Sequence, residues 1–213
     1  MTRKIIIILP TPIAVGDLTM MQSLFLFLKE KNPGVILDVI AAQKTPELIF
    51  RMPEIRRVIS SPLTHGKLDL RLRYRLARLL RAEKYDQAIT LSTSFKAGLV
   101  PWLARIPIRT GFRRKWGVTL LNDTQLLPRP RLPRMIQRFL SVASKPREII
   151  NEKLYWPKIK TDSVALETTL KKYQISSESI IRNRILVLCP GSTGGMSKRW
   201  PIDYFAKLSQ HFL

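Results

Sequence analysis

A glycine-rich segment near the end of the chain combines residue types that bind phosphate groups. An apolar run at 185–188 leads into Gly191, which is followed by two hydroxyl side chains and then by an ammonium group. Amides of a glycine-rich turn, with a cation and a helix start close by, stabilise phosphate oxygens. The spacing matches neither the P-loop nor the dinucleotide-binding pattern, and a basic surface turn is the alternative. We therefore predict Ser192, Thr193 and Lys198 as phosphate ligands.

A carboxylate follows the first apolar run of the chain, 5–9. Gly16 and Asp17 stand between this run and a helical pattern at 18–31. The start of a helix that follows a parallel strand lies at the ligand-binding edge of an α/β sheet, and the helix amides there favour an ionised carboxylate. Asp17 is therefore a candidate general base. The alternative is that Asp17 serves only as the N-cap of the helix.

A hydroxyl and an ammonium follow a later apolar run, 87–91. Ser94 and Lys96 would then lie at the same sheet edge as Asp17, where they could hold an anionic ligand. The alternative is a serine N-cap beside a solvated lysine.

Strands and helices alternate in the sequence pattern. Continuous β-branched runs are typical of strands that are buried on both faces. The predicted strands are 5–9, 35–41, 58–59, 87–91, 106–110 and 185–188, and the predicted helices are 18–31, 47–52, 68–81, 97–104, 135–143, 163–173 and 202–213. This alternation predicts an α/β fold with a doubly wound parallel sheet.

The helix predicted around 71–81 is rich in arginine. Leucines 68, 72, 76 and 79 recur at helical spacing, and arginines fill the positions between them. We expect the leucines to pack on the sheet and the arginines to lie in water. A basic amphipathic helix on an anionic membrane is the alternative.

The overall charge favours an anionic partner, and the alternative is a basic surface without such a partner. The 37 Lys and Arg residues outnumber the 15 Asp and Glu residues and give a formal net charge of +22. One cysteine and two histidines are too few for a zinc site, and we expect no metal or cofactor. No stretch approaches the roughly 20 apolar residues of a membrane span, so we expect a cytoplasmic protein without a transmembrane segment.

Several segments occur together in one known family. They are GDLTMMQSL (16–24), LDVIA (37–41), MPEI (52–55), YD (85–86), SFKAGLVP (94–101), IRTGF (108–112), LLND (120–123) and CPGSTGGMSKRWP (189–201). In order and spacing the chain resembles the ADP-heptose:lipopolysaccharide heptosyltransferase II group of glycosyltransferase family 9.

The resemblance implies a GT-B glycosyltransferase with two Rossmann-like domains. Residues 1–180 would form the acceptor-binding domain with its linker, and residues 181–213 would start the domain that binds ADP-heptose. The implied reaction transfers heptose, with inversion, to a heptose of the lipopolysaccharide inner core at the cytoplasmic face of the inner membrane. Asp17 matches the general base. Ser192, Thr193 and Lys198 match the donor-diphosphate loop, and Ser94 and Lys96 are candidate acceptor ligands.

The family continues through further strands and helices of the donor domain. We therefore expect this chain to be a truncated or partial form that transfers little heptose by itself. Two alternatives come from other classes. One is a basic α/β nucleic-acid-binding protein, suggested by charge but without a recognisable reading module. The other is a dehydrogenase, which the absence of G-x-G-x-x-G after the first strand disfavours.

Overall fold

The chain forms two compact units, Met1–Lys160 and Thr161–Leu213. The structure, a computed structural model, describes residues 2–11, 13–42, 46–64, 66–113, 119–126, 132–144, 155–176, 178, 186–192 and 195–212. The sequence places the domain boundary later, at 180/181. Helix α6 (Ser163–Lys172) lies between the two boundaries and has no buried residue; the boundary at 180/181, which counts the linker with the first domain, stays a prediction.

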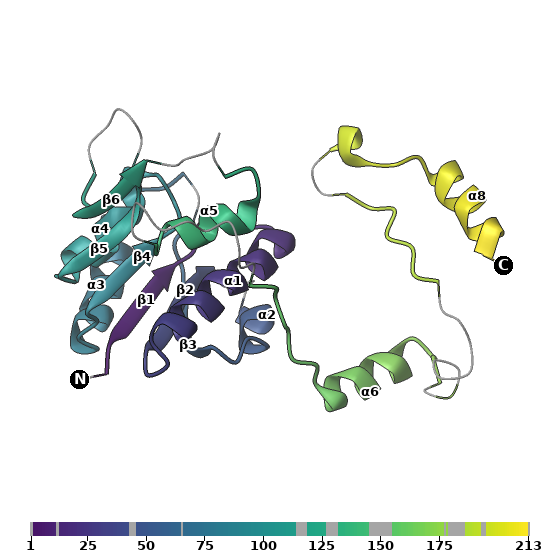
Figure 1. The fold of residues 1–213 in the computed structure, drawn as a ribbon, viewed down its shortest axis with the longest axis horizontal. Coiled ribbons are helices and arrows are strands. Elements are labelled where there is room, and N and C mark those ends of the chain that lie inside the picture. Colours follow the sequence, from purple (N-terminus) through teal and green to yellow (C-terminus); the bar gives the residue numbers. More distant parts are fainter. Residues whose placement is uncertain are drawn as a thin grey trace. The chain divides into compact units, whose positions relative to one another are not determined.

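A six-stranded parallel sheet forms the centre of the first unit. Its strand order is β3-β2-β1-β4-β5-β6, so the first strand in the chain lies inside the sheet (Figure 1). Because all strands are parallel, their carboxyl ends meet at one edge. The strands are β1 (Lys4–Ile8), β2 (Ile36–Ala42), β3 (Ile55–Ser61), β4 (Gln87–Thr90), β5 (Ile108–Arg113) and β6 (Asp123–Leu126).

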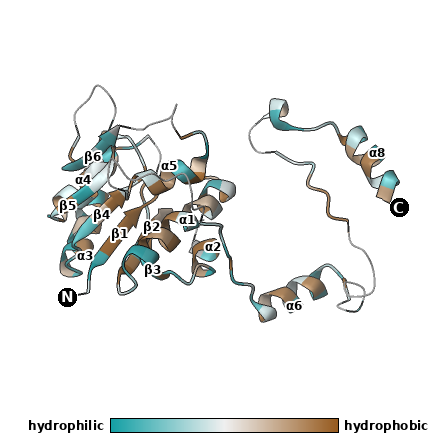
Figure 2. Ribbon diagram, in the orientation of Figure 1, coloured by the Kyte–Doolittle hydropathy of each residue, from teal (hydrophilic) through white to brown (hydrophobic). Residues whose placement is uncertain are grey.

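Helices cover both faces of the sheet. Successive residues of β1 face opposite sides: Ile5 and Ile7 pack in a core with α1, α2 and α5, whereas Ile6 packs in a core with α3 and α4. Figure 2 colours β1 and β2 mainly as hydrophobic and shows hydrophilic residues on edge strand β3. The helices of this unit are α1 (Val15–Lys31), α2 (Pro46–Phe50), α3 (Leu70–Ala82), α4 (Phe95–Leu103) and α5 (Met135–Ser141).

The parallel α/β class predicted from the sequence is confirmed, with local corrections. The sequence misses β6, a four-residue strand of polar composition that pairs with β5. It also starts β5 at residue 106, although pairing begins at Ile108. No distinct apolar pattern marks strand β6 or the first residue of β5, because both are set by pairing with a neighbouring strand.

The second unit contains α6, the 3-10 helix η1 (Met196–Lys198) and α8 (Ile202–Phe212). The strand predicted at 185–188 is not formed over its described residues, 186–188, where Val187 is 75% exposed. Residue 185 lies outside the described residues. An apolar run becomes a strand only when another strand satisfies its backbone groups, and the described residues of this unit form no strand.

Residues 155–160, at the end of the first unit, are held against α1 by a buried glutamine. Gln22 is fully buried; its side-chain oxygen accepts from the backbone nitrogen of Lys158 at 2.9 Å, and its nitrogen donates to the Lys158 carbonyl at 2.9 Å. The backbone nitrogen of Lys160 donates to the Arg51 carbonyl. Tyr155 packs edge-on against Phe27. The side chain of Gln22 thus replaces the backbone partners that a strand would supply.

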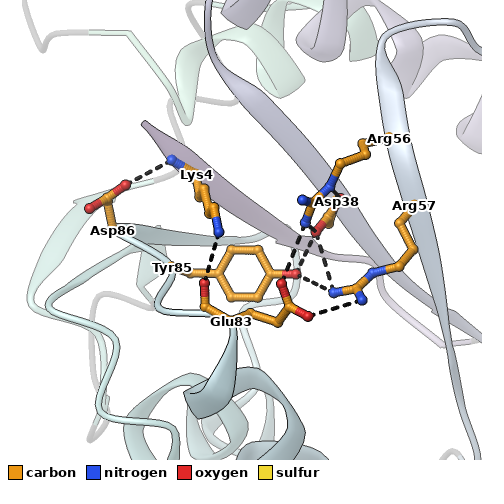
Figure 3. A network of polar contacts seen from close by, with 7 residues as sticks. All are labelled: Lys4, Asp38, Arg56, Arg57, Glu83, Tyr85 and Asp86. Atoms are coloured by element: carbon orange, nitrogen blue, oxygen red, sulfur yellow. Dashed lines mark hydrogen bonds and ion pairs between the residues drawn. The ribbon is translucent and has the colours of Figure 1, made fainter. Parts of the chain in front are cut away.

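A polar network joins β2, β3 and the turn between α3 and β4. The Asp38 carboxylate is fully buried and accepts from Arg56 Nε at 3.0 Å and from the Tyr85 hydroxyl (Figure 3). Arg57 bridges Tyr85 and Glu83 at 3.1 Å each. Burial opposes the charge of Asp38, but the hydrogen bonds from Arg56 and Tyr85 and the charges of both arginines outweigh it and hold the pKa of this carboxyl below its usual 3.8.

Replacing Asp38 should destabilise the first unit. Asp38→Asn removes the charge that Arg56 and Tyr85 contact, and we expect the free energy of unfolding at neutral pH to fall by about 1–3 kcal/mol. Because the folded pKa lies below the unfolded one, the contribution of the carboxylate is complete above about pH 3.8 and is lost as the pH falls through the folded value. Urea unfolding across this range should show the variant approaching the unmodified chain at low pH. The exposed Glu47→Gln is the control, and a difference that persists unchanged at low pH would contradict the assignment.

Candidate functional site

A cleft of about 980 Å³ opens at the carboxyl edge of the sheet. Its lining includes residues at the carboxyl ends of five strands, and residues of α3 and α4 complete it; examples are Leu9, Ala41, Ser61, Ser92 and Arg113. All these residues belong to the first unit. The cleft lies where open parallel α/β sheets bind their ligands.

The described lining of the cleft carries positive charge without a carboxylate. It contains Lys67, Arg73, Lys96 and Arg113, and none of its described residues is Asp or Glu. Hydroxyl side chains surround these cations: Thr11, Ser61, Thr64, Ser92, Thr93, Ser94 and Thr119. Cations in a partly enclosed site attract anions more strongly than cations in open water do. Together with the hydroxyls, they suit a sugar that bears phosphate or carboxylate groups.

Arg73 is the buried cation of the cleft. Only 6% of this residue is exposed, and its guanidinium donates to the Lys96 carbonyl at 2.7 Å and to the Leu68 carbonyl. Burial lowers its pKa, and the more distant charge of Asp69 opposes that effect only in part. Arg73 thereby connects the turn before α3 to the first turn of α4. The sequence predicts that the arginines of this helix lie in water. That prediction is wrong for Arg73.

The leucine stripe predicted for α3 also needs correction. The residues that face the core are Arg73, Leu76, Ala77 and Leu80, whereas Leu79 is 65% exposed. The spacing 73, 76, 77 and 80 is itself the pattern of one helix face. That pattern was the available signal for Arg73, but an arginine among apolar residues is normally assigned to the solvent side.

Ser94 and Lys96 both line the cleft, as expected from their place after β4. Ser94 is the N-cap residue of α4, but its side chain makes no capping hydrogen bond. Lys96 donates to the Gly66 carbonyl at 2.7 Å and is half-buried, so it is not simply solvated. The Ser94 hydroxyl and the cations of Lys96 and Arg73 therefore lie at the start of α4, where backbone amides favour anions. That these residues bind an acceptor stays a prediction.

Asp17 lies in the first turn of α1 and is half-buried. The alternative, that Asp17 is the N-cap, is wrong: Ala14 holds that place, because the helix begins at Val15. Within the described residues its carboxylate has no hydrogen-bonded or ionic partner, and it is absent from the lining of the cleft, although Thr11 of the same connection is present. A Cβ added at Gly16 would meet nothing within 4 Å, so a ligand could approach the backbone there.

The described residues on the two sides of the glycine-rich segment of the second unit contact each other. The Arg199 guanidinium donates to the Ser192 carbonyl at 3.5 Å, and Lys198 ends the 3-10 helix η1 and is exposed. Gly195 has a φ of +94°, a conformation that favours glycine. Trp200 stacks on Tyr204 at 5.6 Å and thereby fixes the start of α8. Of the predicted phosphate ligands, Ser192 and Lys198 are described, while Thr193 lies outside the described residues.

The described helices include none long and apolar enough to cross a bilayer. No group of three or more potential metal ligands occurs among the residues that the structure describes.

Strand order, helices on both faces and a cleft at the carboxyl edge define a Rossmann-like α/β protein. The model of glycosyltransferase family 9 (heptosyltransferase) matches residues 73–213. The chain therefore belongs to glycosyltransferase family 9. Its sheet is the Rossmann-like part of a GT-B fold.

Known relatives agree with this family. Lipopolysaccharide heptosyltransferase 2 of Escherichia coli K12 is 35% identical over 215 residues, which cover 99% of this chain and 60% of the relative. The solved structure of E. coli ADP-heptose lps heptosyltransferase II superposes with a TM-score of 0.82 at 33% identity, covering 98% of this chain and 61% of that one. E. coli heptosyltransferase WaaC with ADP shares the fold, with a TM-score of 0.61 at 16% identity and coverage of 96% and 61%.

The chain thus spans about 60% of the length of the curated relatives it matches. Neither the family nor these relatives support the nucleic-acid-binding or dehydrogenase alternatives.

Loss of Arg73 should loosen the cleft. Arg73→Met keeps much of the apolar stem but removes two hydrogen bonds to carbonyls, so we expect a loss of about 1–3 kcal/mol in unfolding free energy. Hydrogen exchange should also quicken at residues 66–69 and at the first turn of α4. Arg71→Met, on the exposed side of the same helix, is the matched control. Equal effects of the two substitutions would show that the bonds of Arg73 contribute nothing.

Proposed function

We propose that this chain forms the acceptor-binding domain and the start of the donor-binding domain of a heptosyltransferase of lipopolysaccharide inner-core synthesis. The donor is ADP-heptose, and the acceptor is a heptose of the inner core at the cytoplasmic face of the inner membrane. The observation that carries the proposal is the cleft of the first unit, cationic and rich in hydroxyls, in a chain of glycosyltransferase family 9.

The acceptor fits this cleft by its chemistry. Inner-core sugars bear phosphates and carboxylates beside many hydroxyls, and the described lining of the cleft offers four cations and seven hydroxyl side chains. Lys96 and Ser94 stand at the start of α4, where the helix dipole adds to their attraction for an anion. Charge-assisted hydrogen bonds of this kind are stronger than neutral ones.

Asp17 is proposed as the general base of the transfer. The acceptor hydroxyl loses its proton to the Asp17 carboxylate while its oxygen bonds to the anomeric carbon of the donor heptose. The bond from that carbon to the diphosphate oxygen breaks with inversion, and ADP leaves with the electron pair. Among the described residues, no hydrogen bond or ion pair of Asp17 would have to break for the transfer to occur.

The turn at 191–198 is proposed to hold the donor diphosphate. Lys198 supplies a point charge, and Ser192 and Thr193 supply hydroxyls and amides to the phosphate oxygens. Positive charge at the leaving diphosphate stabilises the charge that develops there in the transition state. A related fold, E. coli heptosyltransferase WaaC, has been solved with ADP.

Removing the charge of Lys96 should weaken acceptor binding. Lys96→Gln is expected to reduce the affinity of the chain for a lipid-free inner-core oligosaccharide by about 10- to 150-fold, because a charge-assisted hydrogen bond is worth about 1.5–3 kcal/mol. Calorimetric titration at two salt concentrations measures this, and the affinity of the unmodified chain should fall as salt rises. Lys171→Gln on α6 is the charge-matched control. Equal affinity of Lys96→Gln and the control would contradict the acceptor site.

Asp17→Asn should slow transfer strongly without weakening acceptor binding. We expect the rate to fall by about 10²–10⁴, the usual contribution of general-base catalysis, with acceptor affinity unchanged. Turnover of ADP-heptose is measured on the chain itself and on a fusion of residues 1–213 with the remaining part of the E. coli relative. If the active form retained its full rate with Asn at position 17, the assigned base would be wrong.

A further inference from the structure

The outer face of α3 presents cations and large apolar side chains together. Arg73, Leu76, Ala77 and Leu80 face the core, and the opposite side of the helix carries Arg71, Arg75 and Arg78. Beside these arginines, Tyr74 is 51% exposed and Leu79 is 65% exposed. A helix that only shields the sheet would keep its large apolar residues on the inner side.

A groove of about 690 Å³ continues this face toward the edge strand β3. It is lined by Arg57, Val58 and Ile59 of the strand, by Arg75, Arg78, Leu79 and Ala82 of the helix, and by Glu83. The single carboxylate is already engaged, because Glu83 pairs with Arg57 at 3.1 Å and with Arg56 at 3.6 Å. Arg75 and Arg78 have no hydrogen-bonded or ionic partner within the described residues. Two cations therefore stand uncompensated beside an exposed leucine.

We propose that the outer face of α3, with this groove, docks on the surface of an anionic phospholipid bilayer. Arg75 and Arg78 contact headgroup phosphates, and Leu79 and Tyr74 enter the boundary between headgroups and acyl chains. This mixture of basic and apolar residues is what interfacial helices present to anionic lipid. Duplex nucleic acid fits less well, because its phosphate backbone would attract the arginines but would leave the leucine without an apolar environment.

The position of the helix connects this surface to the cleft. Arg73 and Leu76 line the cleft, while Arg75, Arg78 and Leu79 line the groove on another side of the same helix. One helix, about 10–12 Å across with its side chains, therefore separates the docking surface from the cleft. A glycolipid acceptor held in the bilayer would need to extend its sugars by only about that distance. The inference rests on the proposed function, since the acceptor lipid is what brings the chain to a membrane.

Vesicle binding tests the surface directly. The chain should sediment with vesicles of phosphatidylethanolamine and phosphatidylglycerol but not with vesicles of phosphatidylcholine alone, and binding should weaken as salt rises. Each arginine near an anionic surface contributes about fivefold in affinity, so Arg75→Gln with Arg78→Gln should reduce binding by about 25-fold. The control, Lys171→Gln with Lys172→Gln, removes the same charge from α6 and should bind as the unmodified chain does. Equal loss in both double variants would overturn the proposal.

Further measurements distinguish a lipid surface from duplex DNA, and the proposed membrane surface from the proposed acceptor site. Leu79→Ser should weaken vesicle binding but leave binding to duplex DNA unchanged. If this substitution does not affect vesicle binding, and DNA binds as tightly through the same arginines, the surface is a nucleic-acid site and the proposal fails. Thermal unfolding establishes that each variant is folded. The Arg75 and Arg78 double variant should still bind the lipid-free inner-core oligosaccharide. If the unmodified chain binds the oligosaccharide but not the vesicles, only the membrane surface is refuted. If it binds the vesicles but not the oligosaccharide, only the acceptor site is refuted.

Discussion

The parallel pairing of β1 with β2 on one side and β4 on the other is the constraint on which the rest of the first unit depends. Parallel pairing directs every strand end to one edge, and the burial of β1 on both faces requires helices on both. Ile5 and Ile7 therefore define one core and Ile6 the other. The connections that follow β1, β3 and β4 are brought together at the carboxyl edge even though they are distant in sequence. The cleft is a consequence of this arrangement.

Charge is handled differently at the two ends of the sheet. Near its amino edge, the buried Asp38 carboxylate is matched by Arg56, and Glu83 is matched by Arg57. At the carboxyl edge, Arg73 is buried with carbonyl oxygens as its partners, and none of the described carboxylates contacts it. Carbonyls satisfy the hydrogen bonds of a guanidinium but do not neutralise its charge. The first arrangement stabilises the fold, and the second leaves a positive potential that favours anionic ligands.

The α3 helix joins three features of the molecule. Its inner face completes one core, its first turns contribute Arg73 and Leu76 to the cleft, and its outer face bears cations beside exposed Leu79. The arginines of this helix thus lie in two separate environments. A single buried arginine holds the turn before α3 against the start of α4, and the exposed arginines remain available to an external surface.

The sequence by itself determined the parallel class of the sheet, most strands and helices of the first unit and the family resemblance, because burial on two faces and helical spacing leave periodic patterns in the chain. It also placed Ser94 and Lys96 at the cleft, since residues that directly follow a buried parallel strand have one possible edge to occupy. Strand β6, the buried position of Arg73 and the hold of Gln22 on Lys158 were decided only by the tertiary structure. Strand β6 forms only by pairing with β5, and Arg73 and Gln22 depend on backbone groups outside their own helices. A polar side chain carries no local mark of which of those backbone groups will satisfy it.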